Sequence, residues 1–230
     1  MDDAALESTF AACERALADG GEVDLRSLGF WRAGARVKRD TALRFRYAER
    51  VARIDRSAFA QRVSTRTDAA VGVVVLALIT AAGILLLGAA ASIAHPWREL
   101  IVLAGAGALI GATHDLAHFL VGAALGIRFT DFFIDVPARK PQPGLKLDYA
   151  SYLRAPAAAR AWMHASGAIV SKLVPFLVIL YALAIGCDAW AALVLAAIGV
   201  LSIATDVLFS VRASDWKRFR REMRLARRSN

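Results

Sequence analysis

Four long apolar stretches constrain this chain more than any other feature of its sequence. The first, residues 69–93, contains no charged residue, and the others span about residues 100–126, 161–186 and 189–211 with few ionisable side chains inside. A helix needs about 20 apolar residues to cross the hydrocarbon core of a bilayer. Four such stretches in one chain are not typical of soluble proteins. The sequence therefore predicts an all-α membrane protein built on a four-span helical bundle.

The distribution of lysine and arginine predicts the orientation of this bundle. Residues 1–67, 127–160 and 212–230 together carry 27 of them, the 94–99 connection carries one, and the 186–188 connection carries none. Such residues collect in cytoplasmic segments. We therefore expect a multi-pass protein of a prokaryotic cell membrane with both termini in the cytoplasm. The net charge of +9 is then explained by membrane lipid, and no nucleic-acid partner is expected.

Residues 1–67 are expected to form a cytoplasmic helical module. Apolar residues recur at helical spacing in two places: Leu6, Phe10, Cys13 and Leu17, and then Leu43, Tyr47, Val51 and Ile54. Asp40 is a suitable N-cap for the second helix. The module carries no catalytic constellation, so its simplest interpretation is a small cap or a docking surface for a partner.

The segment 127–160 has the pattern of a small cytoplasmic β-hairpin. Apolar residues alternate near Phe129–Ile134 and again near Leu145–Tyr149, with Pro141, Pro143 and Gly144 predicted to form the turn. An exposed strand edge here would be able to pair with an extended peptide. A plain connecting loop is an equally good interpretation of the same residues.

The basic tail, residues 212–230, is expected to form a helix at the membrane surface. Trp216, Phe219 and Met223 fall on one helical face, and Ser214 is placed to cap the helix. An apolar face within a basic helix is typical of helices that lie on anionic lipid.

Ionisable and small residues form one stripe on each of three spans. Ionisable residues inside a membrane are costly and are usually functional. The stripes follow helical spacing: Gly107, Gly111, His114, His118 and Gly122; His164, Gly167, Ser171 and Pro175; Gly199, Ser202, Asp206 and Ser210. Small residues let neighbouring helices approach closely. We therefore expect the three stripes to face protein and to converge on one site.

His114 and His118 are four residues apart, so both imidazoles lie on one helix face. Two imidazoles on successive turns can hold one metal ion, and a third protein ligand leaves the fourth position for water, as in catalytic zinc sites. Asp206 is the preferred third ligand, and His164 is the alternative. Asp115, beside the first histidine, is the candidate general base.

Simpler interpretations remain open for each of these residues. The two histidines of span two could only hydrogen-bond between helices. Asp206 could form an ion pair with Lys172, and His164 could lie at the level of the lipid headgroups. A haem or diiron protein is a further class. Four histidines are few for a diiron site, and two histidines on one face do not suit a haem held between facing helices.

The residues His114-Asp115-Leu116-Ala117-His118 resemble the H-E-x-x-H helix of the site-2 protease family of intramembrane zinc metalloproteases, with aspartate in place of glutamate. The resemblance covers about residues 100–211. It implies a metalloprotease-like core over residues 68–211, zinc as cofactor, a later span that supplies a ligand aspartate corresponding to Asp206, and a transmembrane protein or peptide as substrate. The alternative is a catalytically impaired relative that binds metal or membrane proteins.

Overall fold

The computed structural model describes residues 1–20, 23–135, 142–208 and 214–229 of the 230-residue chain. Over these residues the chain is mostly helical and includes one small antiparallel sheet.

The chain folds into two compact units that alternate along the sequence. The first contains Met1–Ala69 and Gly126–Pro156, and the second contains Ala70–Leu125 and Ala157–Asn230. The segment between the second and third spans therefore packs with the N-terminal helices, whereas the sequence-based division assigned it to the membrane core. It does so because Leu153, in the short helix α6 (Tyr149–Arg154), is buried in the same apolar core as those helices.

Four helices of the second unit are long and apolar enough to cross a membrane. They are α4 (Ala69–Ala90), α5 (Trp97–Ala124), α7 (Ala157–Ala184) and α8 (Ala189–Leu208). Their bounds differ from the four apolar stretches of the sequence by only a few residues. Large apolar side chains are exposed along them, among them Leu78, Leu85, Leu180 and Leu193. Such a surface suits lipid tails better than water.

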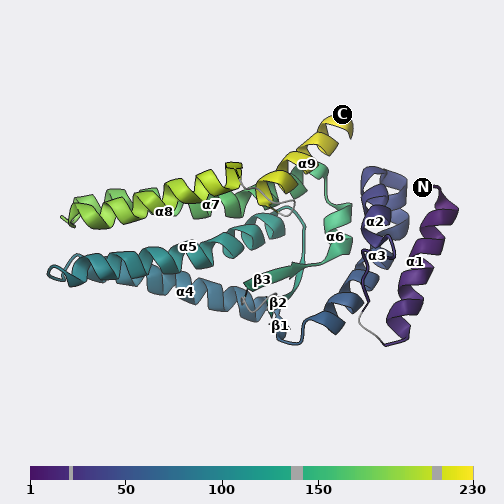
Figure 1. Ribbon diagram of the computed structural model, residues 1–230, viewed down its shortest axis with the longest axis horizontal. Helices are drawn as coiled ribbons and strands as arrows, with labels where there is room; N and C mark the ends of the chain where they lie inside the picture. Colours follow the sequence, from purple (N-terminus) through teal and green to yellow (C-terminus); the bar gives the residue numbers. More distant parts are fainter. Residues whose placement is uncertain (21–22, 136–141, 209–213, 230) are drawn as a thin grey trace. The chain divides into compact units, whose positions relative to one another are not determined.

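The second unit consists of two helical hairpins, α4–α5 and α7–α8, with α5 packed against α7 (Figure 1). Glycines permit a close approach of α4 and α5 at one point. A Cβ on Gly83 of α4 would lie 3.1 Å from the carbonyl oxygen of Gly105 on α5. A Cβ on Gly107 or Gly111 would meet no atom of another described element within 4 Å, so the expectation that these two glycines mediate close packing is wrong. Two residues turn a helix by about 200°, and Gly105 rather than Gly107 therefore faces α4.

A ninth helix among the described residues, α9 (Asp215–Ser229), packs against α7. Glu222 of α9 and Arg160 of α7 form an ion pair, with 2.8 Å between Oε2 and Nε, and both side chains are almost completely buried. Loss of either partner would leave a buried charge without compensation. The pair therefore fixes the position of α9 along α7. The backbone N–H of Lys217 donates to Ser214 Oγ at 3.4 Å, which agrees with the predicted cap.

The first unit contains the predicted helical module as α1 (Asp3–Ala18), α2 (Phe30–Arg39) and α3 (Thr41–Arg62). The apolar faces of α1 and α3 are buried in one core, whose members include Leu6, Phe10, Cys13, Leu43, Tyr47, Val51 and Ile54. Asp40 Oδ1 accepts a hydrogen bond from the backbone N–H of Leu43 at 3.2 Å and so caps α3 as predicted.

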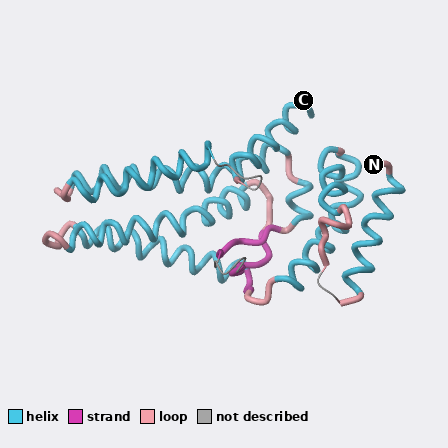
Figure 2. Tube along the Cα trace, in the orientation of Figure 1, coloured by secondary structure: helices cyan, strands magenta, loops and turns pink. Residues whose placement is uncertain are grey.

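The predicted hairpin is present as β2 (Phe129–Asp135) paired with β3 (Gln142–Leu147) (Figure 2). Pro143 and Gly144 belong to β3, opposite Ile134 and Phe133, and so do not form the predicted turn. Proline is tolerated in an edge strand because its missing N–H faces away from the partner. The predicted turn residue Pro141 lies outside the described residues.

A third strand, β1 (Arg66–Asp68), pairs antiparallel with the other edge of β2 and was not expected. Its three residues are exposed, and two of them are charged, so they carry no alternating apolar pattern. The strand forms because β2 offers unpaired backbone groups at this edge. Among the described strands, β1 and β3 are the edge strands, and each keeps one edge without a strand partner.

Candidate metal centre

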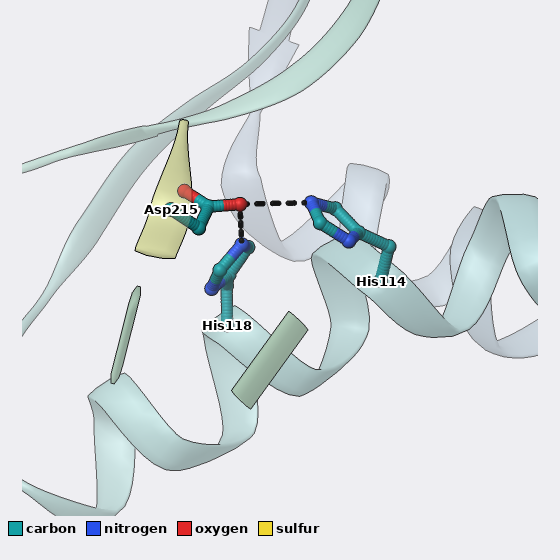
Figure 3. Close-up of side chains that lie close together, drawn as sticks. All are labelled: His114, His118 and Asp215. Atoms are coloured by element: carbon teal, nitrogen blue, oxygen red, sulfur yellow. Dashed lines mark hydrogen bonds and ion pairs between the residues drawn. The ribbon is translucent and has the colours of Figure 1, made fainter. Parts of the chain in front are cut away.

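Two histidines of α5 and one aspartate of α9 meet at a single point (Figure 3). His114 Nε2 lies 3.4 Å from Asp215 Oδ2, and His118 Nε2 lies 3.3 Å from the same oxygen. The two imidazole rings are nearly perpendicular, at 87°, with centroids 4.7 Å apart. Both rings therefore present Nε2 to one carboxylate oxygen.

Gly167 on α7 makes room for this arrangement. A Cβ at this position would lie 2.4 Å from His118 Nε2 and 2.8 Å from the carbonyl oxygen of His114. Real Cβ atoms do not come so close, so the ring of His118 occupies space that any other residue at 167 would fill. Gly167 belongs to the predicted stripe of small residues on span three. At this position the stripe lets α7 pack closely against the histidine face of α5.

The other ring nitrogens of both histidines are engaged by α7. His118 Nδ1 lies 2.6 Å from the carbonyl oxygen of Met163, and His114 Nδ1 lies 3.3 Å from Ser171 Oγ. A carbonyl can only accept, so Nδ1 of His118 must carry a proton. The Ser171 hydroxyl in turn lies 3.5 Å from the carbonyl of Ala168 and can donate to it, which lets it accept from His114. In a neutral imidazole with Nδ1 protonated, Nε2 carries a lone pair.

The carboxyl group of Asp215 is ionised in this site. Burial by itself raises its pKa, but hydrogen bonds and positive charge from protonated imidazoles of His114 and His118 outweigh burial and hold the pKa well below its usual range. An ionised carboxylate is an acceptor only. With both imidazoles neutral, two Nε2 lone pairs and the carboxylate oxygen converge and need a positive charge between them. That charge is either a proton on each imidazole or a metal ion.

The distances fit a metal ion. Zinc–nitrogen and zinc–oxygen bonds of about 2.0–2.1 Å place neighbouring donors of a tetrahedral site about 3.3–3.4 Å apart. The two nitrogen–oxygen distances, 3.4 and 3.3 Å, have this value and exceed the usual range for an N–H···O hydrogen bond. Imidazole and carboxylate are ligands that suit zinc. The residues present therefore fit a three-ligand zinc site.

The structure brings Asp206 to Lys172 rather than to the histidines. Asp206 Oδ2 lies 2.5 Å from Lys172 Nζ, which is the ion pair that the sequence offered as the alternative. His164 is buried beside the centre, with Nδ1 3.9 Å from the second oxygen of Asp215. Its ring centroid is 6.5 Å from that of His118. His164 therefore borders the centre, and Asp215 holds the position predicted for the third ligand.

Asp115 is half-buried on α5 and is not one of the three converging groups. At 100° per residue, its side chain leaves the helix about 60° from that of His118 and 100° from that of His114. Its carboxylate makes no hydrogen bond or ion pair with any of the described residues. Asp115 therefore lies beside the candidate ligands with its oxygen atoms uncommitted to the described part of the chain.

Asp215 was not identified from the sequence because it lies beyond the last span, in a tail interpreted as a lipid-binding helix. A signal for it exists. The tail contains eight basic residues and only two acidic ones, Asp215 and Glu222, which are seven residues apart and hence on one helical face. Both acidic side chains are largely withdrawn from solvent in the structure. Isolated acids on one face of a basic helix indicate protein contacts.

Comparison of the chain with family models, curated proteins and solved structures gave no match.

Proposed function

We propose that this protein is a membrane-embedded zinc hydrolase, in which His114, His118 and Asp215 hold the metal and the substrate is a peptide bond in or near a membrane segment. The convergence of both Nε2 atoms on one carboxylate oxygen, at distances equal to the edges of a zinc tetrahedron, carries the proposal. The position of the pair in a long apolar helix supports a substrate that reaches the site from the membrane.

A zinc ion with three protein ligands is a Lewis acid with a position left for water, which is the chemistry that hydrolysis of an amide requires. Contacts behind the candidate ligands support this role. Met163 and Ser171 orient the imidazoles by binding Nδ1, which directs each Nε2 toward the metal position. The Arg160–Glu222 pair holds α9, and with it Asp215, against α7.

Asp115 is the group available to accept the proton of the attacking water. It is the acid next to the first histidine and makes no hydrogen bond or ion pair within the described part of the chain. A general base must come within about 2.6–3.2 Å of its proton donor, directly or through one water. Because aspartate is one methylene shorter than glutamate, the distance between the Asp115 carboxylate and the water decides whether Asp115 can act as the base.

The position of Asp115 also favours a second function, that of a zinc-binding membrane protein without hydrolytic activity. Asp115 is not among the residues that converge at the centre, and an aspartate is one methylene shorter than a glutamate. If its carboxylate does not reach the water, the protein binds zinc and membrane segments without cleaving them. Misplacement by about 1 Å can lower a rate by about 10²-fold.

The metal centre is tested by zinc content in purified, detergent-solubilised protein. His114→Ala, His118→Ala and Asp215→Asn should each lose one equivalent of zinc relative to the unmodified chain. Asp206→Asn is the matched control and should keep it, since Asp206 binds Lys172. Full zinc retention in both histidine variants would rule out the centre.

Hydrolysis is tested with transmembrane peptides in proteoliposomes, with products identified by mass spectrometry. Cleavage by the unmodified chain that is lost in Asp115→Asn, with zinc retained, supports the hydrolase. Cleavage gained only in Asp115→Glu supports the zinc-binding protein without activity. Equal cleavage by the unmodified chain and Asp115→Asn would remove Asp115 from the mechanism.

A further inference from the structure

A second cluster of ligand-type side chains lies at the opposite end of the second unit, where the α4–α5 and α7–α8 connections come together (Figure 1). His95 is in the first connection, Glu99 is in the first turn of α5, and Asp188 directly precedes α8. Glu99 and His114 are separated by about 22 Å along the axis of α5, at about 1.5 Å per residue. The cluster is therefore independent of the centre formed by His114, His118 and Asp215.

Both carboxylates of the cluster approach the same ring nitrogen. His95 Nδ1 lies 3.1 Å from Asp188 Oδ2 and 3.3 Å from Glu99 Oε2. One potential ligand atom from each of the three residues lies within 4.8 Å of the other two. Two carboxylates at this separation repel each other unless a positive charge lies between them.

Glu99 is the most informative member of the cluster, because its side chain is only 1% exposed. Its Oε1 atom accepts a hydrogen bond from the backbone N–H of Asp188 at 3.1 Å. Its Oε2 atom is buried and lies 3.3 Å from His95 Nδ1, but accepts no hydrogen bond of good geometry from the described residues. A buried carboxylate oxygen without a donor is destabilising and rare in native proteins. This oxygen faces His95 Nδ1 without a hydrogen bond between them, so a cation bound by both atoms would supply the partner that it lacks.

The surrounding backbone is already held in place without a cation. The guanidinium of Arg98 donates to the carbonyl of Ile93 in one connection and to those of Ile185 and Gly186 in the other, at 2.9, 3.0 and 3.1 Å. The two connections are thus joined next to the cluster. His95 is 58% exposed, which leaves a route from solvent to the buried carboxylate.

We propose that His95, Glu99 and Asp188 form a second metal site, which binds a divalent transition cation such as zinc and links the two helical hairpins. One imidazole and two carboxylates favour such a cation over calcium or magnesium, which prefer oxygen ligands alone. The site joins α4–α5 to α7–α8 because its ligands come from both connections.

The test is zinc stoichiometry in the full-length chain, with the first centre removed by the double variant His114→Ala/His118→Ala. The double variant should retain one equivalent of zinc. Adding Glu99→Gln should abolish that equivalent, as should adding His95→Ala. Glutamine keeps the shape of residue 99 and its hydrogen bond from Asp188, so the fold is preserved. Ser92→Ala is the matched control, because it changes an exposed residue of the same connection that offers none of the three ligand atoms.

X-ray absorption at the zinc edge provides a second readout on the double variant. One imidazole nitrogen and carboxylate oxygens in the first shell would support the site. A double variant that binds no zinc, or one that keeps its zinc after Glu99→Gln, would overturn it and would show an imidazolium–carboxylate cluster instead. If Glu99→Gln alone removes all bound zinc and His114→Ala/His118→Ala removes none, the result supports this site and counts against the centre formed by His114, His118 and Asp215.

Discussion

Replacement of Gly167 by alanine tests the geometry of the centre more directly than removal of a ligand does. A Cβ at this position would lie 2.4 Å from His118 Nε2, 2.7 Å from His118 Cε1 and 2.8 Å from the backbone oxygen of His114. Ordinary contacts of this kind begin at 3.4 Å, so the ring nitrogen must retreat by about 1 Å or α5 and α7 must separate. Metal–ligand distances tolerate changes of only about 0.2 Å. Gly167→Ala therefore cannot keep both the contact between α5 and α7 and the position of His118 Nε2.

The expected magnitude follows from overpacking. Extra methylene groups in a well-packed interior cost about 1–3 kcal/mol. At about 1.4 kcal/mol for each factor of ten, zinc affinity at this centre should fall by about 5- to 150-fold. The backbone oxygen of His114 cannot rotate away as a side chain can, which favours the upper part of this range.

Competition with a chromophoric zinc chelator would measure the affinity in a Glu99→Gln background, so that only one site is followed. Gly111→Ala is the matched control, because Gly111 is on the same stripe of α5 and nothing among the described residues lies within 4 Å of its Cβ position. It should bind zinc as the unmodified chain does. Equal affinity in Gly167→Ala and Gly111→Ala would refute the proposed placement of His118 between α5 and α7.

Three further predictions concern stability. Glu222→Gln leaves the buried guanidinium of Arg160 without its counter-charge, so hydrogen exchange of α9 should accelerate by an amount corresponding to about 3–5 kcal/mol and zinc at the adjacent centre should weaken. Asp40→Ala removes the cap of α3 and should lower the thermal stability of the first unit by about 0.5–2 kcal/mol. Arg50 binds both oxygens of Glu14 and holds the pKa of that carboxyl below its usual value. The stabilisation that the Arg50–Glu14 ion pair gives to the folded unit is complete above the unfolded pKa of about 4.3 and is lost as the pH falls through the folded pKa. Protection of α1 amides against hydrogen exchange should therefore drop on acidification, and Arg50→Gln should make this drop smaller.

The long helices and their faces could be predicted from the sequence, because each depends on periodicity within one segment. Long apolar runs with few or no charged residues specify the span helices, and helical spacing specifies the buried faces of α1 and α3. The common face of His114 and His118 follows from a separation of four residues in the same way. The pairing of β2 with β3 is also local, since one short connection joins the two strands.

Contacts between distant segments were decided by the tertiary structure. Asp215 reaches the histidines because a buried ion pair between residues 62 positions apart holds α9 on α7, and no local pattern specifies which acid in the tail faces which helix. Asp206 lies on a polar stripe that does face protein, yet its partner is Lys172 on α7, and only the packing of α8 determines this. The same holds for Glu99 and Asp188, which are far apart in sequence and meet because Arg98 joins the two connections. A helical pattern predicts which residues share a face, whereas the partner of that face depends on how the helices pack.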